Sequence, residues 1–214
     1  NILLKLLKEK IKLHGSGRTD AGVHALEQSA HFDCKNKIID KRKFLKSLNF
    51  FLNKKNISIL KIKARNQNFH SRFSAKERTY LYLIRNDPAP SMINYNREWN
   101  IRNKLDINLM KRGAKKLIGT HDFSTFRASN CAAKSPIRTI NKIQILKSKK
   151  QIKIRIKSPS FLKSQVRSMV GSLKYLSEKK WDLKKFNIIL KSKDRKKCAP
   201  LAPAHGLYLE KVIY

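Results

Sequence analysis

The nine-residue stretch Gly-Arg-Thr-Asp-Ala-Gly-Val-His-Ala, at positions 17–25, holds the side chain best placed to do chemistry. Its Asp20 lies two residues after an arginine and between two glycines, in a chain with 50 basic and 14 acidic side chains. Nearby positive charge favours the ionised form of a carboxylate, so Asp20 is a candidate nucleophile or base that acts on a polyanion. Glycine and aspartate are also the residues that a tight turn requires. From this motif alone, a plain turn and a catalytic loop are both open.

The composition of the chain points to a polyanionic partner. Its 214 residues carry a formal net charge of +36 and are 41% hydrophobic. Such a charge favours nucleic acid as the partner over an anionic membrane surface. A genome-wide bias towards Lys, Ile and Asn explains part of the lysine content equally well. The arginines are therefore more informative, because a guanidinium binds phosphate through two parallel hydrogen bonds.

Metal, disulfide and membrane functions are not indicated. Cys34, Cys131 and Cys198 are far apart and odd in number, which favours free thiols in a reducing, cytoplasmic compartment. The six histidines show no metal-ligand spacing, so we expect no metal. No apolar run approaches eighteen residues, so we expect no membrane-spanning helix.

Hydrophobic periodicity and capping residues predict two segments of helices and strands. For the first segment the predicted elements are a helix at 2–12, a strand at 23–34, a helix from Asp40 to 53 and a strand at 57–62. The polar stretch 65–68 is predicted to be the linker. For the second segment they are strands at 78–84, 140–146, 151–156 and 206–213, and helices at 106–118, 161–176 and 183–190.

The second segment thus follows the order strand-helix-strand-strand-helix-strand with one added helix, and the first repeats this series without its first strand. This order indicates an α+β fold of two ferredoxin-like βαββαβ halves with antiparallel sheets side by side. We place the halves at 1–68 and 69–214. We also expect the sequence to be truncated at its N-terminus and to lack a leading strand.

Three further clusters combine aromatic and basic side chains or place an arginine among apolar ones. Residues 69–82 mix Phe, Tyr, His and Arg, which suits base stacking, although an amphipathic strand with core tyrosines is equally compatible. Residues 121–127 form an expected loop in which two phenylalanines are either contact tips or buried plugs. Arg167 lies in an apolar helical stretch and needs an anionic partner if it is buried; Asp20 is the candidate, and a solvent-facing arginine is the alternative.

Taken in order, these motifs resemble the tRNA pseudouridine synthase A family. The resemblance covers the 17–25 stretch, Phe69–Ala75 with Arg78–Tyr82, Asp122–Arg127 with Ser135–Arg138, Phe161–Gly171, and Cys198–Pro200 with Gly206–Leu209. It implies that Asp20 is the catalytic carboxylate, that Arg18 and Arg167 hold it and a phosphate, and that Tyr80 stacks on the target base. The other substrate-binding residues that it implies are Gly22, His24, Arg72, Arg78, Phe126, Arg127 and Leu207.

The resemblance also implies the reaction, namely isomerisation of uridine to pseudouridine at positions 38–40 in the anticodon stem-loop of tRNA. It implies a homodimer that needs no cofactor. Family members begin with a strand carrying Tyr-Asp-Gly and a Gly-Trp-Gln segment, which are not in this sequence, so we expect the 214-residue chain to be unstable alone. Two other classes stay open: a non-catalytic RNA-binding protein, which would not need Asp20, and an RNA-cleaving enzyme, which would usually need a histidine pair or metal-binding carboxylates.

Overall fold

The computed structural model describes residues 2–214 and divides into two compact units. Unit 1 contains the chain up to Gly17 and Ser29–Ser74, and unit 2 contains Arg18–Gln28 and Ala75–Tyr214. The architecture is α+β, as the sequence predicts. The loop that carries Asp20 belongs to unit 2, although it precedes most of unit 1 along the chain.

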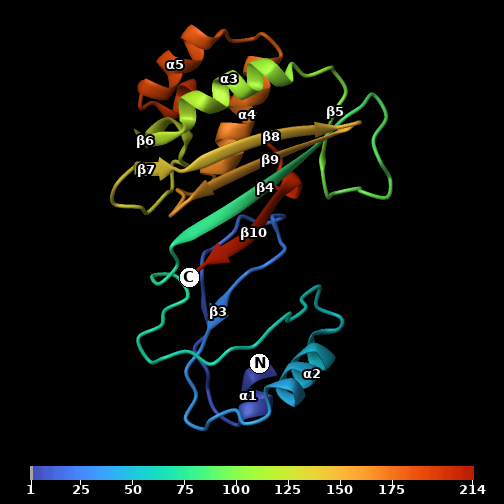
Figure 1. The fold of residues 1–214 in the computed structure, drawn as a ribbon, viewed down its shortest axis with the longest axis vertical. Coiled ribbons are helices and arrows are strands. Elements are labelled where there is room, and N and C mark those ends of the chain that lie inside the picture. Colours follow the sequence, from blue (N-terminus) through green and yellow to red (C-terminus); the bar gives the residue numbers. More distant parts are fainter. Residues whose placement is uncertain (1) are drawn as a thin grey trace. The chain divides into compact units, whose positions relative to one another are not determined.

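Unit 2 is built on one sheet with four long antiparallel neighbours (Figure 1). These strands are β4 (Glu77–Asn86), β8 (Lys142–Ser148), β9 (Gln151–Ser158) and β10 (Leu207–Ile213), in the spatial order β10-β4-β9-β8. Two short strands extend the sheet: β2 (His24–Ala25) pairs parallel with β10, and β5 (Trp99–Ile101) pairs parallel with the end of β4. The predicted hairpin and the two other strands of this segment are confirmed.

Helices cover one face of this sheet (Figure 1). They are α3 (Ile107–Leu117), α4 (Gln165–Ser177) and α5 (Leu183–Lys191), close to the predicted positions except that α4 begins four residues later. The Asp106 and Asp182 side chains cap α3 and α5 by accepting a main-chain N–H at 2.9 and 2.7 Å. The core between helices and sheet is apolar and includes Tyr82, Ile84, Met110, Ile154, Ile156, Met169 and Leu173.

A short hairpin in unit 2 was not predicted. It consists of β6 (Gly119–Asp122) and β7 (Ile137–Ile140), and the 3₁₀ turn η1 (Ser124–Phe126) follows β6. The loop predicted at 121–127 is therefore wrong in its first two residues. Strands of four residues show too little alternation to reveal themselves in sequence. Two more 3₁₀ turns, η2 (Arg195–Lys197) and η3 (Ala204–Gly206), precede β10.

Unit 1 contains less regular structure than the sequence predicts. Its elements are α1 (Ile2–Leu7), β1 (His14–Gly15), β3 (Ala30–His31) and α2 (Lys41–Leu52), and Asp40 caps α2 as expected. The helix predicted to reach residue 12 ends early, since Lys8 takes a φ of 59°. The strand predicted over 23–34 is also wrong, because its two ends pair with different strands: β2 with β10 in unit 2, and β3 with β1 in unit 1.

The strand predicted at 57–62 is absent from the described structure. A strand needs a neighbouring strand to satisfy its main-chain groups. Here the Asn49 side chain of α2 takes that place, accepting from the Ile59 N–H at 2.7 Å and donating to the Ile59 carbonyl at 2.9 Å. Ile57 and Leu60 remain exposed. Within residues 2–214 no helix has both the length and the apolar character needed to cross a bilayer.

Candidate active site

Asp20 opens a tight turn at the start of unit 2. The Val23 N–H donates to the Asp20 carbonyl at 3.1 Å, and Gly22, the third residue of the turn, has a φ of +80°. A turn of this kind requires a positive φ at its third residue, which glycine adopts without strain. The backbone of the motif therefore forms the turn that its glycine and aspartate predict. It leaves the carboxylate side chain free to serve a site.

Two donors meet one oxygen of the Asp20 carboxylate. Arg167 Nη1 lies 2.8 Å and Ser164 Oγ 3.0 Å from Oδ2. The Asp20 and Arg167 side chains are 22% and 17% exposed, so the ion pair is partly shielded from water but still reachable. The partner that the sequence suggested for Arg167 is thus the one in the structure. Hydrogen bonds between charged groups are roughly twice as strong as neutral ones.

Both donors come from the N-terminal end of α4. Ser164 directly precedes the helix and Arg167 is its third residue. The helix dipole adds partial positive charge at this end, which attracts an anionic side chain. Arg167 is held in turn by the segment before η3: its Nε donates to the Ala202 carbonyl at 2.8 Å, and its own carbonyl accepts the Ala202 N–H at 3.2 Å.

Gly171 lets this segment approach α4. A Cβ atom at Gly171 would lie 2.1 Å from the Pro200 carbonyl oxygen, so no larger residue fits without moving the backbone. The close approach brings Ala202 to Arg167, one turn earlier on the same helix. Gly171 thereby takes part in placing the guanidinium that binds Asp20.

Tyr80 lies on β4 and is half-buried beside Asp20. Its ring packs edge-to-face on Phe161, with centroids 5.1 Å apart. Burial raises the pKa of the Tyr80 phenol; Arg78 opposes this shift and the Asp20 carboxylate adds to it. Tyr80 is therefore neutral at physiological pH. Arg78 itself donates to the Pro159 carbonyl, 2.6 Å away.

A second group of aromatic and histidine side chains borders the turn. His24 on β2 stacks on Tyr208 of β10 with centroids 4.8 Å apart, and its Nε2 lies 3.0 Å from the Asn96 carbonyl oxygen. His205 lies close enough to be affected by both His24 and Arg167: burial lowers its pKa, and these two groups lower it further. The contacts of His24 with Tyr208 and Asn96 thus hold β2, the strand that follows the Asp20 turn, in place.

The remaining predicted site residues lie in different environments. Phe126 and Leu207 are buried in the core. Of the two alternatives for Phe126, an exposed contact tip or a buried plug, the structure therefore has the buried one. Arg127 is half-buried next to Ala128, whose N–H donates to the Lys163 carbonyl beside Ser164. Arg18 is exposed and makes none of the hydrogen bonds that Asp20 receives from residues 2–214.

Arg72 is exposed and belongs to unit 1, where its guanidinium lies 5.6 Å from the Phe73 ring centroid. Sequence reasoning missed Ser164 and Ala202. Ser164 stands next to an apolar helix without any pattern of its own, and Ala202 acts through its backbone. No signal in one sequence identifies either residue.

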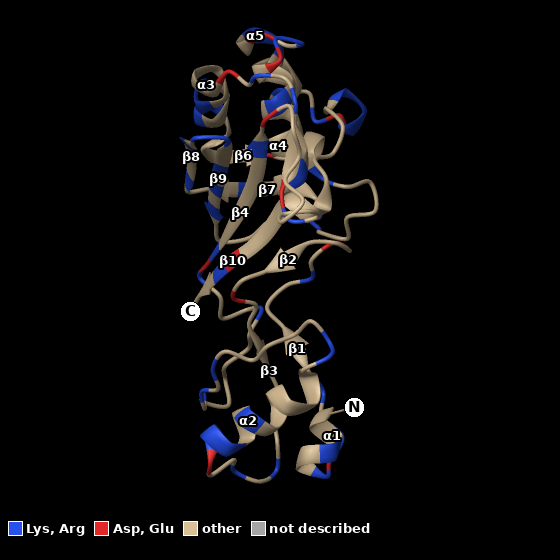
Figure 2. Cartoon of the chain, turned by 90° about the vertical axis from the view of Figure 1, so that its right-hand side faces the viewer, with Lys and Arg blue, Asp and Glu red and all other residues tan. Residues whose placement is uncertain are grey.

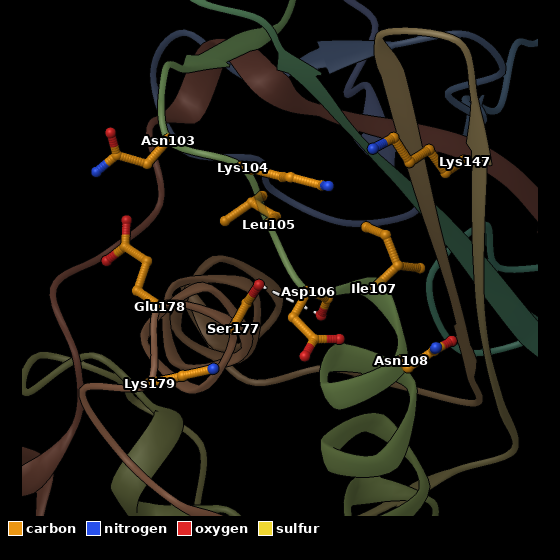
Figure 3. Close-up of a pocket in the computed structure, with 10 residues that line it drawn as sticks. All are labelled: Asn103, Lys104, Leu105, Asp106, Ile107, Asn108, Lys147, Ser177, Glu178 and Lys179. Carbon is orange, nitrogen blue, oxygen red and sulfur yellow. Dashed lines mark hydrogen bonds between the residues drawn. The ribbon is translucent and has the colours of Figure 1, made fainter.

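A hollow between the start of α3 and the end of α4 lies elsewhere in the described structure (Figure 3). It has a volume of about 620 Å³ and is lined by Asn103–Asn108, Lys147 and Ser177–Lys179. Ser177, which donates to the Asp106 carbonyl at 3.3 Å, is the last residue of α4. Arg167 is near the first, so the hollow and Asp20 are separated by most of the helix, about 15 Å at 1.5 Å per residue. The hollow does not belong to the Asp20 site.

Basic residues are spread over the helices, strands and loops of both units (Figure 2). On β9, Lys153, Arg155 and Lys157 alternate with buried isoleucines and so share the sheet face turned away from the helices. Two of them are neutralised, Arg155 by Glu210 at 2.9 Å and Lys157 by Glu77 at 3.6 Å. The described residues contain no cluster of His, Cys, Asp or Glu that could hold a metal ion.

Comparison with known proteins identifies relatives along nearly the whole chain. A family model described as tRNA pseudouridine synthase matches residues 114–214. The tRNA pseudouridine synthase A of Pelagibacter ubique (strain HTCC1062) is 61% identical over 212 residues, which cover 99% of this chain and 86% of the relative. The protein of the same name from Brucella anthropi is 39% identical over 211 residues, or 98% of this chain and 84% of the relative. The chain belongs to the tRNA pseudouridine synthase A family, a family of isomerases.

Proposed function

We propose that this protein isomerises uridine to pseudouridine at positions 38–40 in the anticodon stem-loop of tRNA, with Asp20 as the catalytic nucleophile or base. The observation that carries the proposal is the Asp20 carboxylate itself. Arg167 and Ser164 bind its Oδ2, and no residue of the 2–214 chain donates to Oδ1. One oxygen is therefore held while the other is available to a substrate. A protein that only bound RNA would not need this carboxylate, which repels phosphate.

The reaction suits a site of this composition. The C1′–N1 glycosidic bond breaks, a C1′–C5 bond forms, the C5 hydrogen leaves and N1 gains a hydrogen, so nothing is oxidised or reduced. A carboxylate can add to the sugar or base, or take the proton. The uridine must first leave the helical stack, which costs a few kcal/mol. Stacking on Tyr80 and phosphate contacts from the basic surface, Arg18 among them, would offset that cost.

The topology supports the finer fold assignment. Numbered along the chain, β4, β8, β9 and β10 stand in the order 4-1-3-2 and α3 and α4 connect them as in a ferredoxin-like βαββαβ unit. We infer that unit 2 contains such a half and that residues 1–68, apart from the Arg18–Gln28 stretch that lies in unit 2, belong to a second one. We also propose that the protein works in the cytoplasm, as a homodimer on tRNA. His24, Gly22, Arg72, Arg78 and Arg127 are proposed substrate contacts.

The test is release of tritium from tRNA labelled at C5 of uridine. We expect release from a tRNA with uridine at positions 38–40 and almost none from the matched tRNA with cytidine at those three positions. Binding of the two tRNAs is measured in parallel. Tight binding of both without any release would favour the RNA-binding alternative, and release from the substituted tRNA would refute the assigned positions.

A further inference from the structure

Ser164 has an unusual backbone conformation for the residue before a helix. Its φ of 59° and ψ of 8° lie in the left-handed region, which non-glycine residues occupy at a cost. A capping serine normally has an extended backbone and accepts a main-chain N–H of the first turn. Ser164 makes no such bond in α4. By contrast, Asp40, Asp106 and Asp182 cap their helices in the usual way.

The hydroxyl of Ser164 is instead turned to the carboxylate. Its Oγ donates to Asp20 Oδ2 at 3.0 Å, to the same oxygen that Arg167 binds at 2.8 Å. A single donor leaves a carboxylate free to turn about its Cβ–Cγ bond, because that torsion is soft and has broad minima. Two donors from different directions restrict this rotation. The unbound Oδ1 is then presented in one orientation.

The start of α4 does not depend on the hydroxyl. The Ser164 carbonyl accepts the Ser168 N–H at 3.0 Å, and the buried Gln165 side chain accepts the Leu162 N–H at 2.8 Å. Both bonds remain if the Ser164 side chain is removed. The Ser164 hydroxyl therefore adds no hydrogen bond to the helix, and a strained backbone of this kind is common where strain serves a site.

We propose that Ser164 is a positioning residue that fixes the Asp20 carboxylate so that Oδ1 is the oxygen that reacts. The inference rests on the proposed function of Asp20. It assigns a role to a residue that touches Asp20 but not the reacting atoms. It also gives the two carboxylate oxygens different roles: Oδ2 binds Ser164 and Arg167, and Oδ1 reacts.

Two variants separate the hydroxyl from the backbone conformation. Glycine and asparagine both tolerate the left-handed region, but only asparagine brings a donor, its Nδ2 amide. We expect Ser164→Gly to lower kcat for C5 tritium release about 10-fold, as for loss of one hydrogen bond to a charged group, with KM within about 2-fold. Its thermal midpoint should not fall, because glycine relieves the strain. Ser164→Asn should recover kcat to within about 3-fold of wild type.

The wild-type protein and Asp20→Asn are measured in the same assay. Absent release by wild type would refute the proposed function, whereas the Ser164 variants test only the inference. A kcat within about 2-fold of wild type for Ser164→Gly would overturn the positioning role. Equal losses in the glycine and asparagine variants would overturn it as well, since restoring the donor would then have no effect.

Discussion

Gly171→Ala tests whether the segment before η3 places Arg167. The new Cβ would lie 2.1 Å from the Pro200 carbonyl oxygen, whereas an ordinary contact begins at 3.4 Å, so the segment must move by about 1.3 Å. Such a movement stretches the 2.8 Å bond from Arg167 Nε to the Ala202 carbonyl beyond hydrogen-bonding range. A misplacement of about 1 Å in a catalytic site can cost about 100-fold in rate, which is the loss of kcat that we expect.

The stability change from Gly171→Ala should be smaller than the change in activity suggests. Overpacking costs about 1–3 kcal/mol, and replacing a glycine in a helix returns up to about 1 kcal/mol. A net loss of about 1–2 kcal/mol lowers the thermal midpoint of a chain of this size by about 2–8 °C. The variant should therefore melt only slightly below wild type, as a thermal melt followed by circular dichroism would show.

Gly113→Ala is the matched control. Its Cβ would lie 2.4 Å from Leu176 Cδ2 and 3.1 Å from Leu173 Cδ2, both of them mobile side-chain ends on α4. It therefore overpacks the same helix without touching the support of Arg167, and we expect kcat within about 2-fold of wild type. If both alanine variants lose the same activity, or if Gly171→Ala keeps the wild-type rate, the reasoning about Arg167 is refuted.

Three further perturbations have definite expected outcomes. Tyr80→Ala should raise KM about 10-fold or more, because stacking of a base on an aromatic ring is worth about 1–3 kcal/mol, whereas Tyr80→Phe should keep KM near wild type; steady-state kinetics decide this. Binding to tRNA should weaken at least about 10-fold between 50 and 200 mM salt, as measured by filter binding, and a flat response would contradict phosphate contacts. Burial, with His24 and Arg167, lowers the pKa of His205, so below about pH 6.5 the unfolded state binds more protons than the folded state. The thermal midpoint should therefore fall with acidification, and it should fall less in His205→Gln.

Local rules explain which elements were predictable. The three aspartate-capped helices follow from an acceptor placed before an apolar periodicity, and both signals lie within a few residues. The prediction of a strand at 57–62 was wrong because strand pairing depends on two segments. Asn49 makes the hydrogen bonds that a neighbouring strand would have made. The prediction of one continuous strand at 23–34 was wrong for a related reason, since its two parts pair with different strands.

The site was predictable where charge demanded a partner. Arg167 and Asp20 are 147 positions apart, yet an arginine in an apolar helix needs an anion, and few carboxylates are present. Ser164 and Ala202 had no such requirement. The Ser164 hydroxyl binds Asp20 instead of capping α4, and the Ala202 carbonyl binds the Arg167 guanidinium. Both contacts depend on the three-dimensional course of the backbone, so only the structure reveals them.

The central claim is that Asp20 performs the chemistry, and the single-turnover rate of C5 tritium release by Asp20→Asn tests it most directly. Asparagine has nearly the same shape and can keep its Oδ1 as the acceptor for Arg167 and Ser164, but it carries no charge and is a poor nucleophile and base. We expect the rate to fall at least about 1,000-fold while tRNA binding and the thermal midpoint stay close to wild type. A rate within about 10-fold of wild type, with binding intact, would contradict the account.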